Sequence, residues 1–349
     1  MITAVTGASG HIGGNLVRAL LAEGRRVRCL VRSDRRALEG LPVERVEGEI
    51  FDPRAMRRLL DGAGTLFHLA GRISIVGAEG GLVEKTNVQG VRGVVEASLA
   101  AGVRRLVHVS SIHAFSTHPN DQLIDETRAL ALAPEHMVYD RSKARGQLEV
   151  LEGVKRGLDA VIVNPGAVVG PFDFKPSRMG EVILDIYHRR LPALLDGGYN
   201  WVDARDVAAG ALAAERQGRT GECYLLTGHW VHICEVSALI GRLAGRETPQ
   251  LATPLWLAML ASYGSLAWGL VRGKVPKFTP GAVRSIQMHR YISHAKANRE
   301  LGYLPRPFEE TVRHPGLVRR GGDAGRALRR AAGFRRRGLS RRAVTLRRR

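Results

Sequence analysis

The chain opens on the stretch ITAVTGASGHIG, residues 2–13, and this stretch decides the fold. Residues 2–6 form a β-branched run of strand length, and Gly7, Gly10 and Gly13 follow as a G-x-x-G-x-x-G loop. Apolar residues at helical spacing begin inside the loop and stop at Gly24. A strand, a glycine loop and a helix in this order place an anion at a helix N-terminus, where backbone N–H groups and the helix dipole attract a pyrophosphate.

The loop is therefore expected to bind a dinucleotide. Gly10 leaves room for the phosphates, and Gly13 lets the helix pack closely on the strand. A bare turn is the alternative interpretation, which the flanking strand and helix disfavour. The loop residues expected to hold the dinucleotide are Gly7, Ser9, Gly10, His11, Ile12 and Gly13.

The charge of the chain is concentrated at one end. Of the net charge of +20, the segment 316–349 supplies +12, because it holds thirteen arginines and a single acid, Asp323. The other 315 residues carry the remaining +8, and the hydrophobic content of 44% is that of a globular protein. We expect the segment 316–349 to be a disordered, solvated tail without specific nucleic-acid binding.

Cysteine and histidine usage gives no metal site. Cys29, Cys223 and Cys234 form no C-x-x-C pair, and His229 and His232 have no third ligand spaced for a metal. Scattered thiols indicate a reducing compartment, and the first strand begins at Ile2 without a signal peptide before it. We expect a cytoplasmic protein without a metal.

Strands alternate with helices along the first half of the chain, which predicts a parallel, doubly wound α/β sheet. The expected strands are 27–32, 43–50, 65–71 and 105–109. Asp52 and Pro53 are expected to begin a helix, and Asn87 lies at the start of another that runs to Ala101. The strand 65–71 ends in Leu69, Ala70 and Gly71, small or apolar residues against which a cofactor can lie.

The end of the second strand is expected to meet the ribose of the adenosine. An acid there binds the 2′-OH of NAD, whereas an arginine accommodates the 2′-phosphate of NADP. The chain offers Arg32 at this point, with Asp34 as the nearest acid, so NADP is favoured over NAD. Solvated surface arginines are the alternative. Glu49, next to Ile50 at the end of the third strand, is expected to accept from the adenine amino group.

Chemistry-bearing residues follow at the carboxyl end of the strand 105–109. Ligands of open parallel sheets bind beyond such strand ends, which is where Ser110 and Ser111 lie. Tyr139 and Lys143 are four residues apart on one face of an expected helix. A nearby ammonium stabilises a phenolate and lowers the phenol pKa toward the working range. Y-x-x-x-K alone is common, but together with the glycine loop and a strand-end serine it predicts a catalytic pair.

The sequence resembles the extended short-chain dehydrogenase/reductase family, also described as the epimerase/dehydratase superfamily, over roughly residues 1–312. Within the family it looks most like the dihydroflavonol 4-reductase and 3β-hydroxysteroid dehydrogenase branch. The sequence differs from the family pattern at Gly71, where alanine is usual, at Glu49, where aspartate is commoner, and in the tail after His314. The matching motifs are TGASGHIG at 6–13, HLAG at 68–71, VSS at 109–111, YDRSK at 139–143, NPGAVVGP at 164–171 and WVDARDVA at 201–208.

The resemblance implies roles for individual residues. Tyr139 would be the acid/base, Lys143 its pKa partner and ribose anchor, and Ser111 the residue that orients the carbonyl oxygen, with Ser110 still possible. Asn164 and Pro165 would flank the nicotinamide. It also implies a Rossmann-type sheet with a smaller, interleaved C-terminal substrate-binding domain, and a homodimer formed by the helices near 87–101 and 139–153.

These expectations divide the chain into three parts. Residues 1–169 are the NAD(P)-binding domain, 170–315 the substrate-binding region with a strand near 223–227 that returns to the main sheet, and 316–349 the tail. The run from Thr248 to Val271 has no charged residue and holds two tryptophans. We expect buried or lid helices that line an apolar pocket. Shallow membrane contact through 248–277, with Arg272, Lys274 and Lys277 at its edge, is the second interpretation, and a transmembrane span the third.

The function expected from the sequence is NAD(P)-dependent hydride transfer between the cofactor and a secondary alcohol or ketone, with an apolar substrate. The alternative within the enzymes is a nucleotide-sugar epimerase or dehydratase that retains NAD. The alternative of another class is a non-catalytic dinucleotide sensor, against which the presence of Ser111, Tyr139 and Lys143 argues.

Overall fold

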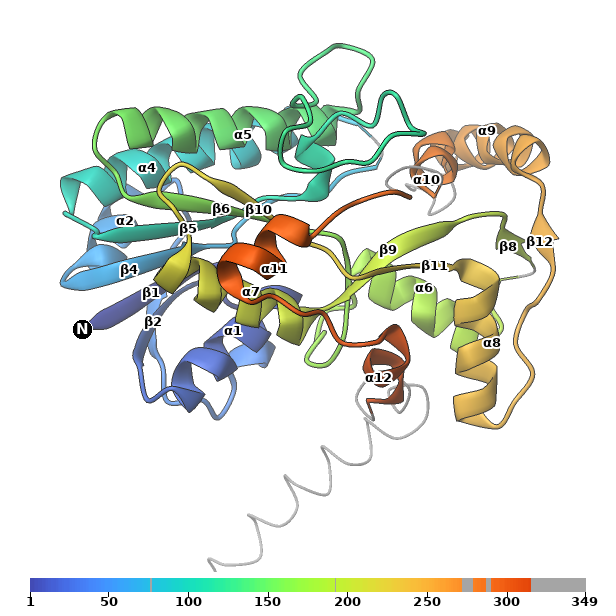
Figure 1. Ribbon diagram of the computed structural model, residues 1–349, viewed down its shortest axis with the longest axis horizontal. Helices are drawn as coiled ribbons and strands as arrows, with labels where there is room; N and C mark the ends of the chain where they lie inside the picture. Colours follow the sequence, from blue (N-terminus) through green and yellow to red (C-terminus); the bar gives the residue numbers. More distant parts are fainter. Residues whose placement is uncertain (76, 192, 272–278, 287–289, 315–349) are drawn as a thin grey trace, which may run out of the picture.

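The computed structural model describes residues 1–75, 77–191, 193–271, 279–286 and 290–314. Its centre is a seven-stranded parallel sheet in the order β10-β6-β5-β4-β1-β2-β3 (Figure 1). The order runs outward in both directions from β1 and β4, as in a doubly wound fold. The predicted fold class is confirmed. The strands are β1 (Ile2–Thr6), β2 (Arg26–Val31), β3 (Glu44–Glu47), β4 (Ala63–His68), β5 (Arg105–Val109), β6 (Ala160–Pro165) and β10 (Cys223–Leu226).

Helices cover both faces of this sheet, on opposite sides in Figure 1. One face packs against α2 (Pro53–Leu60), α4 (Gly90–Ala100) and α5 (Val138–Lys155), with Leu66, Leu106 and Ile162 buried between them. The other packs against α1 (His11–Ala22), α7 (Ala204–Gln217) and α11 (Ala295–Leu301), with Phe67, Val107 and Val163 in the core. Successive side chains of a strand point to opposite faces of the sheet, and both faces are covered by helices. The chain thus needs a continuous apolar run in each central strand.

Two predicted strands are longer than the observed ones. The strand expected at 43–50 ends at Glu47, because Gly48 has a φ of +150° and lies against Ala55 of α2. The Asp52 carboxylate then accepts a hydrogen bond from Arg54 N and caps α2, with Pro53 in its first turn, as expected. The strand expected at 65–71 ends at His68, and residues 69–71 continue as coil beyond the sheet.

The second half of the chain builds a smaller layer beside the carboxyl ends of the main strands. It holds a three-stranded sheet of β7 (Ala167–Val169), β9 (Gly198–Asp203) and β11 (His229–His232), and a short pair of β8 (Leu194–Leu195) and β12 (Ala252–Thr253). Around them pack α6 (Arg178–Tyr187), α8 (Ile233–Ala244) and α12 (Phe308–Arg313), with Trp201 at the centre of this core. Between β9 and β11 the chain returns to the main sheet, where β10 pairs in parallel with β6.

Short helices connect these elements. They are α3 (Leu82–Glu84), α10 (Pro280–Ser285), the 3₁₀ turns η1 (Arg36–Leu38) and η3 (Ile112–Ala114), and a π-helical turn η2 (Lys85–Gln89) that leads into α4. The tail expected from Gly316 onward, and the cations Arg272, Lys274 and Lys277, lie outside the described residues.

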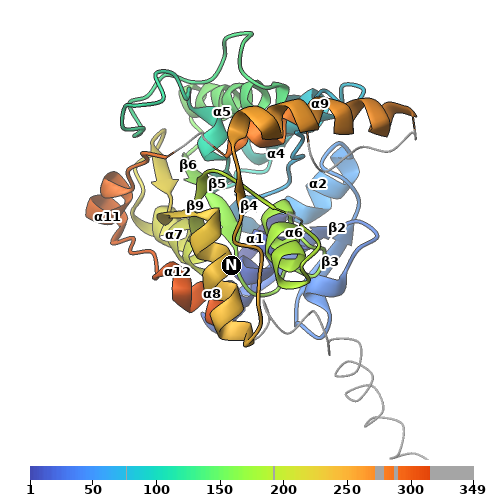
Figure 2. The same ribbon diagram turned by 90° about the vertical axis from the view of Figure 1, so that its right-hand side faces the viewer.

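The uncharged run 248–271 does not form the pocket wall that the sequence led us to expect. It folds into α9 (Leu255–Val271), an outer helix whose Trp256 and Trp268 are 68% and 59% exposed. Figure 2 shows α9 at the periphery of the molecule. The prediction of a pocket-lining helix is wrong, because these tryptophans face outward and not into the fold. No helix in the described ranges is both long and apolar enough to span a bilayer.

Candidate active site

The glycine loop closes tightly on the strand beside it. Gly7 has a φ of +69°, and a Cβ there would lie 2.6 Å from the carbonyl carbon of Leu69. A Cβ on Gly13 would overlap the carbonyl oxygen of Gly7 and lie 2.8 Å from Ala8 Cα. Only glycine fits either position without moving backbone. The loop therefore brings the first turn of α1 directly against the ends of β1 and β4.

The N-terminus of α1 carries no side-chain cap. Gly10 is the N-cap residue, no side chain accepts from the first-turn N–H groups, and the first turn holds no acid. Helix N-termini without such a partner leave N–H donors for another acceptor. The cradle therefore fits the pyrophosphate of a dinucleotide, with the N–H groups of residues 11–13 as donors, since Gly10 N donates to Gly7 O at 3.0 Å.

A cavity of about 380 Å³ begins at this loop and extends to Tyr139. It lies along the carboxyl ends of β1, β4 and β5, between the main sheet and the smaller layer. Eleven of the residues expected from the sequence line it, from five separate parts of the chain. They are Gly7, Gly10, His11, Ile12, Gly13, Leu69, Gly71, Ser111, Tyr139, Lys143 and Pro165.

The other expected residues lie outside the lining of this cavity. Ile50 packs against α4, since its Cδ1 lies 2.5 Å from where a Cβ on Gly90 would be. Asn87 binds the loop after β4, accepting from Arg72 N at 2.8 Å and donating to Arg72 O at 2.8 Å and to Ser142 Oγ at 2.9 Å. The expected residues outside the lining are Ser9, Arg32, Glu49, Ile50, Ala70, Asn87 and Asn164.

Ser111 and Tyr139 meet at the inner end of the cavity. Ser111 follows β5 as the N-cap of η3, and Tyr139 lies in the first turn of α5, 6% exposed. Burial raises the pKa of Tyr139 to about 12, while a hydrogen bond from the Ser111 side chain favours the phenolate. Ser110 is held away from this role, because its hydroxyl accepts from Gln147 Nε2 at 2.9 Å. The serine engaged with Tyr139 is Ser111.

Lys143 lies one turn further along α5 and is 7% exposed. Burial lowers the pKa of its ammonium to about 8, so most of it is charged at neutral pH. Its Nζ donates to Val109 O at 3.4 Å and is 3.4 Å from where a Cβ on Gly71 would lie. Lys143 and Tyr139 are four residues apart on α5, so their side chains lie on the same face of the helix. The cation that lowers the pKa of Tyr139 is Arg178, also in the cavity lining, while Asp140 raises it.

Asn164, at the end of β6, positions the backbone of Ser111. It is fully buried, and its Nδ2 donates to Ser111 O at 2.8 Å. Its Oδ1 has no hydrogen-bond partner among the described residues. The side chain therefore fixes the backbone of Ser111 and retains one unused acceptor inside the site.

Charged residues surround the expected adenosine end. Arg32 is 75% exposed in its side chain and lies 3.7 Å from Glu49. Asp34, the acid nearest to Arg32 in the sequence, accepts two hydrogen bonds from the Arg36 guanidinium at 2.9 and 2.6 Å. Those bonds lower the pKa of Asp34 to about 2, and Lys175 adds to the effect. Asp34 is thus engaged by cations, and the acid that faces Arg32 is Glu49, whose side chain is 58% exposed.

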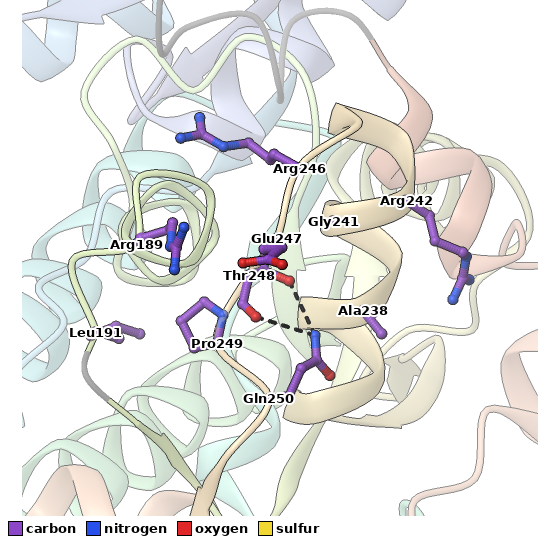
Figure 3. A pocket seen from close by; sticks show the side chains of 10 residues that line it. All are labelled: Arg189, Leu191, Ala238, Gly241, Arg242, Arg246, Glu247, Thr248, Pro249 and Gln250. Atoms are coloured by element: carbon purple, nitrogen blue, oxygen red, sulfur yellow. Dashed lines mark hydrogen bonds between the residues drawn. The ribbon is translucent and has the colours of Figure 1, made fainter.

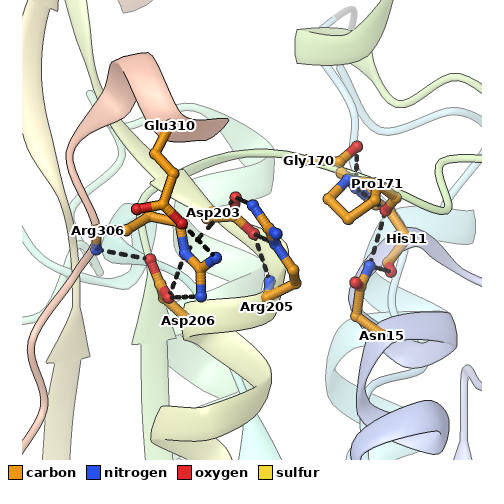
Figure 4. Close-up of polar contacts among 9 residues, drawn as sticks. All are labelled: His11, Asn15, Gly170, Pro171, Asp203, Arg205, Asp206, Arg306 and Glu310. Carbon is orange, nitrogen blue, oxygen red and sulfur yellow. Dashed lines mark hydrogen bonds and ion pairs between the residues drawn. The ribbon is translucent and has the colours of Figure 1, made fainter. Parts of the chain in front are cut away.

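His11 ties the glycine loop to the second half of the chain (Figure 4). Its Nε2 contacts the carbonyl oxygens of Gly170 and Pro171 at 3.2 and 3.1 Å, and Asn15 Nδ2 donates to Pro171 O at 2.9 Å. Burial lowers the pKa of His11, against the opposing effect of Asp173. A neutral imidazole with one N–H suits a bond to a backbone carbonyl. His11 therefore orients the layer that covers the cofactor cradle.

A second set of contacts joins Arg306, in the segment before α12, to α7, also shown in Figure 4. Asp203 caps α7 by accepting from Arg205 N at 2.7 Å and pairs with the Arg205 guanidinium. Asp206 accepts from Arg306 N at 2.9 Å and from Arg306 Nε at 2.8 Å. The carboxylates of Asp203 and Asp206 therefore cap α7 and bind Arg306, and neither residue lines the cavity.

Sequence reasoning missed the cavity residues that come from the connections after β4 and β5 and from the smaller layer. His113 lies beside Tyr139, with ring centroids 5.4 Å apart, and its Nδ1 is 2.9 Å from the Asp140 carboxylate. These residues come from loops and from α6 and β9, where no repeat or spacing marks them. The residues missed are Ile73, Ile75, His113, Met137, Lys175, Ser177, Arg178, Met179, Tyr199 and Asn200.

A second pocket, of about 710 Å³, lies between the end of α6 and α8 (Figure 3). Arg189, Arg242 and Arg246 line it together with Glu247, and it shares no residue with the cavity at the glycine loop. In Figure 3 the Arg242 side chain points away from the other two arginines. The pocket holds none of the expected catalytic groups, so the smaller cavity is the candidate active site.

The fold and the cradle define the class: a Rossmann-type, dinucleotide-binding protein with a substrate layer over the carboxyl ends of its strands. The chain belongs to the NAD dependent epimerase/dehydratase family, whose model matches residues 3–226. The resemblance drawn from the sequence motifs is thereby confirmed, and an NAD(P) cofactor is typical of this family.

Relatives and solved structures extend the similarity over most of the chain. It is 38% identical to sterol demethylase protein B of Methylococcus capsulatus, over 87% of this chain and 94% of that protein. It is 33% identical to a putative dihydroflavonol 4-reductase of Synechocystis, over 85% of this chain and 88% of that protein. The crystal structure of gox2253 superposes with a TM-score of 0.79 at 32% identity, covering 91% of this chain and 98% of that one.

Proposed function

We propose that this protein is an NAD(P)-dependent oxidoreductase that interconverts a secondary alcohol and a ketone. One observation carries the proposal: Ser111, the buried Tyr139 and Lys143, one turn further along α5, line the same cavity as the glycine cradle. A bound nicotinamide cofactor would supply the hydride in reduction and accept it in oxidation. A dinucleotide sensor has no use for a buried tyrosine of this kind.

The chain's own residues handle the proton and the oxygen. In reduction, Tyr139 Oη transfers its proton to the carbonyl oxygen, and the Ser111 hydroxyl donates a hydrogen bond to the same oxygen. The resulting phenolate keeps the Ser111 contact and lies near the Lys143 ammonium, which offsets the cost of a buried negative charge. In oxidation the same atoms act in reverse, with the phenolate accepting the alcohol proton.

We propose an apolar substrate. Around Tyr139 the cavity is lined by Ile73, Ile75, Met137 and Met179, which give a flexible apolar wall. This wall takes the place of the tryptophans that the sequence led us to expect. The similarity to a protein named for sterol demethylation supports the same substrate class. Arg178 and Lys175 are cations in the lining, so a nucleotide sugar is the competing substrate.

A turnover screen decides between these substrates. Purified protein with NADPH or NADH is incubated with polycyclic and isoprenoid ketones, and in parallel with UDP- and dTDP-hexoses. We expect cofactor oxidation with the apolar ketones. Activity confined to the sugars would assign an epimerase or dehydratase, and tight cofactor binding without any turnover would assign a sensor.

We propose NADP(H) as the preferred cofactor, and Arg32→Glu as its test. Removing this guanidinium takes away a partner for the 2′-phosphate and adds a negative charge, so NADPH affinity is expected to fall roughly tenfold or more, with NADH affinity little changed. Fluorescence titration of both cofactors measures the change. Arg57→Glu, the same charge change at an exposed site on α2, is the matched control. Tighter binding of NADH by the unmodified chain would contradict the assignment.

We further propose a cytoplasmic homodimer formed by α4 and α5. Cross-helix ion pairs Arg92–Glu149 and Arg156–Glu96 hold these helices together, and Leu148 is a 42% exposed apolar side chain beside them. Light scattering at micromolar concentration is expected to give a dimer that Leu148→Glu weakens. A stable monomer of the unmodified chain would refute the proposal.

A further inference from the structure

The helix α9 presents its apolar side to the outside. Trp256, Leu260, Tyr263 and Trp268 are 68%, 63%, 53% and 59% exposed, and Leu257 is 45% exposed. At 100° per residue these positions fall on one broad stripe of the helix. No charged residue occurs between Thr248 and Val271. A contiguous exposed apolar stripe of this kind marks an interaction surface.

The opposite side of α9 packs on the protein and is the less apolar of the two. Ser262 is fully buried and donates to Met259 O at 2.7 Å, and Ala258 is 1% exposed. A helix selected only to complete the core would show the reverse pattern, with its largest apolar residues inside. The large side chains of α9 are therefore placed for something other than the core of this chain.

The sequence segment that contains α9 carries charge of a single sign. From Thr248 to Arg299 the sequence contains no Asp or Glu. Among the described residues, Arg284 is exposed on α10, the helix packed against α9, and Arg290 is exposed over the Trp230 ring at 4.7 Å. An apolar helix face within an acid-free, cationic segment complements an anionic lipid surface. The seven cations of the segment are Arg272, Lys274, Lys277, Arg284, Arg290, Lys296 and Arg299.

We propose that the exposed face of α9 docks the protein on an anionic lipid bilayer, lying in the interface without crossing it. The surface adjoins the candidate active site through α10. A Cβ on Gly281 of α10 would lie 2.9 Å from Ile75 O and 3.7 Å from Met137 Sδ, and both residues line the cavity. Docking thus brings the apolar cavity wall next to the membrane. A benefit for substrate entry rests on the apolar substrate proposed above, whereas binding to the bilayer does not depend on it.

Tryptophan fluorescence with vesicles tests the proposal on the full chain. Phosphatidylcholine vesicles with and without phosphatidylglycerol are prepared, and a second set contains brominated lipid as quencher. Of the four tryptophans, Trp201 is 1% exposed and Trp230 is half-buried, so quenching reports mainly Trp256 and Trp268. The arginine-rich segment 316–349 contains no tryptophan, so its adsorption to the vesicles gives no quenching. We expect quenching and a blue shift with anionic vesicles.

Variants separate the apolar and the electrostatic parts of the interaction. Trp256→Gln combined with Trp268→Gln is expected to weaken co-sedimentation with anionic vesicles roughly tenfold or more, in buffer with enough salt to suppress adsorption of the arginine-rich segment. Arg284→Glu is expected to weaken it roughly fivefold. Leu304→Gln, at a 75% exposed leucine outside α9, is the matched control and is expected to bind as the unmodified chain does.

Three outcomes would overturn the proposal. They are no quenching by brominated anionic vesicles, unchanged co-sedimentation of the double tryptophan variant, and light scattering in which that variant dissociates a dimer while vesicles have no effect. The last result would assign α9 to a second copy of the chain. NADPH binding and turnover of a water-soluble ketone without vesicles are expected to be unchanged in these variants, so a failure of docking is distinguishable from a failure of the proposed reaction.

Discussion

Tyr139→Phe is expected to reduce kcat for ketone reduction by at least about a hundredfold, the usual scale of general acid catalysis. The phenylalanine keeps the ring and its burial but removes the hydroxyl that delivers the proton. Because Tyr139 is 6% exposed and its pKa is raised to about 12, the hydroxyl is protonated across the neutral range, as reduction requires. Stopped-flow measurement of NADPH oxidation at saturating substrate determines the change.

Two controls make this result specific. Tyr291→Phe removes a hydroxyl from a tyrosine that is 46% exposed, and it is expected to leave kcat unchanged. Titration of Tyr139→Phe with NADPH is expected to give nearly the affinity of the unmodified chain, since the cradle at α1 is intact. Turnover that survives Tyr139→Phe would show that another group supplies the proton, and the proposed mechanism would be wrong.

Gly13→Ala is expected to have the largest effect on cofactor binding. The added Cβ would overlap Gly7 O and lie 2.8 Å from Ala8 Cα, so the backbone of the cradle must move. Overpacking of this kind costs about 1–3 kcal/mol, here taken largely from the geometry that binds the pyrophosphate. We expect NADPH affinity to fall at least roughly tenfold and the melting temperature to decrease.

Gly93→Ala is the matched control for this substitution. Gly93 also lies in a helix, α4, but a Cβ there has no neighbour within 4 Å. Alanine in an open helical position stabilises the fold by about 0.5–1 kcal/mol relative to glycine. The control is therefore expected to raise the melting temperature slightly and leave NADPH affinity unchanged. Equal losses of affinity in both variants would show that the cradle geometry is not the cause.

Local sequence was sufficient to predict the cofactor half of the molecule. The strand, glycine loop and helix at residues 2–22 lie within one short stretch, and their geometry follows from backbone sterics and helix capping. Asp52 and Pro53 similarly begin α2 where expected, because capping uses neighbours two or three residues away. Strand ends were less well predicted: β3 ends where Gly48, at a φ of +150°, lies against Ala55 of α2, which is not its neighbour in the sequence.

The tertiary structure decided the features that depend on distant segments. Ser110 and Ser111 are equivalent in the sequence, and Gln147 and Asn164, from α5 and β6, distinguish them by binding Ser110 Oγ and Ser111 O. The desolvation that shifts the pKa of Tyr139 and Lys143 comes from burial of both side chains by segments far apart in the chain, which no spacing of residues specifies.

The uncharged run 248–271 shows most clearly which features follow from sequence and which from packing. Its composition indicates an apolar helix without charges. The same composition suits a helix that faces a pocket and a helix that faces outward, so it does not distinguish the two. Orientation depends on which side packs against the rest of the chain, and in α9 that side carries Ala258 and Ser262 while Trp256 and Trp268 stay exposed. The sequence by itself determined the strand, glycine loop and helix of the cradle and pointed to Ser111, Tyr139 and Lys143 near it, because these are local patterns. Only the tertiary structure decided which groups surround Tyr139 and what α9 presents to its surroundings, because burial and orientation are properties of packing between segments far apart in the chain.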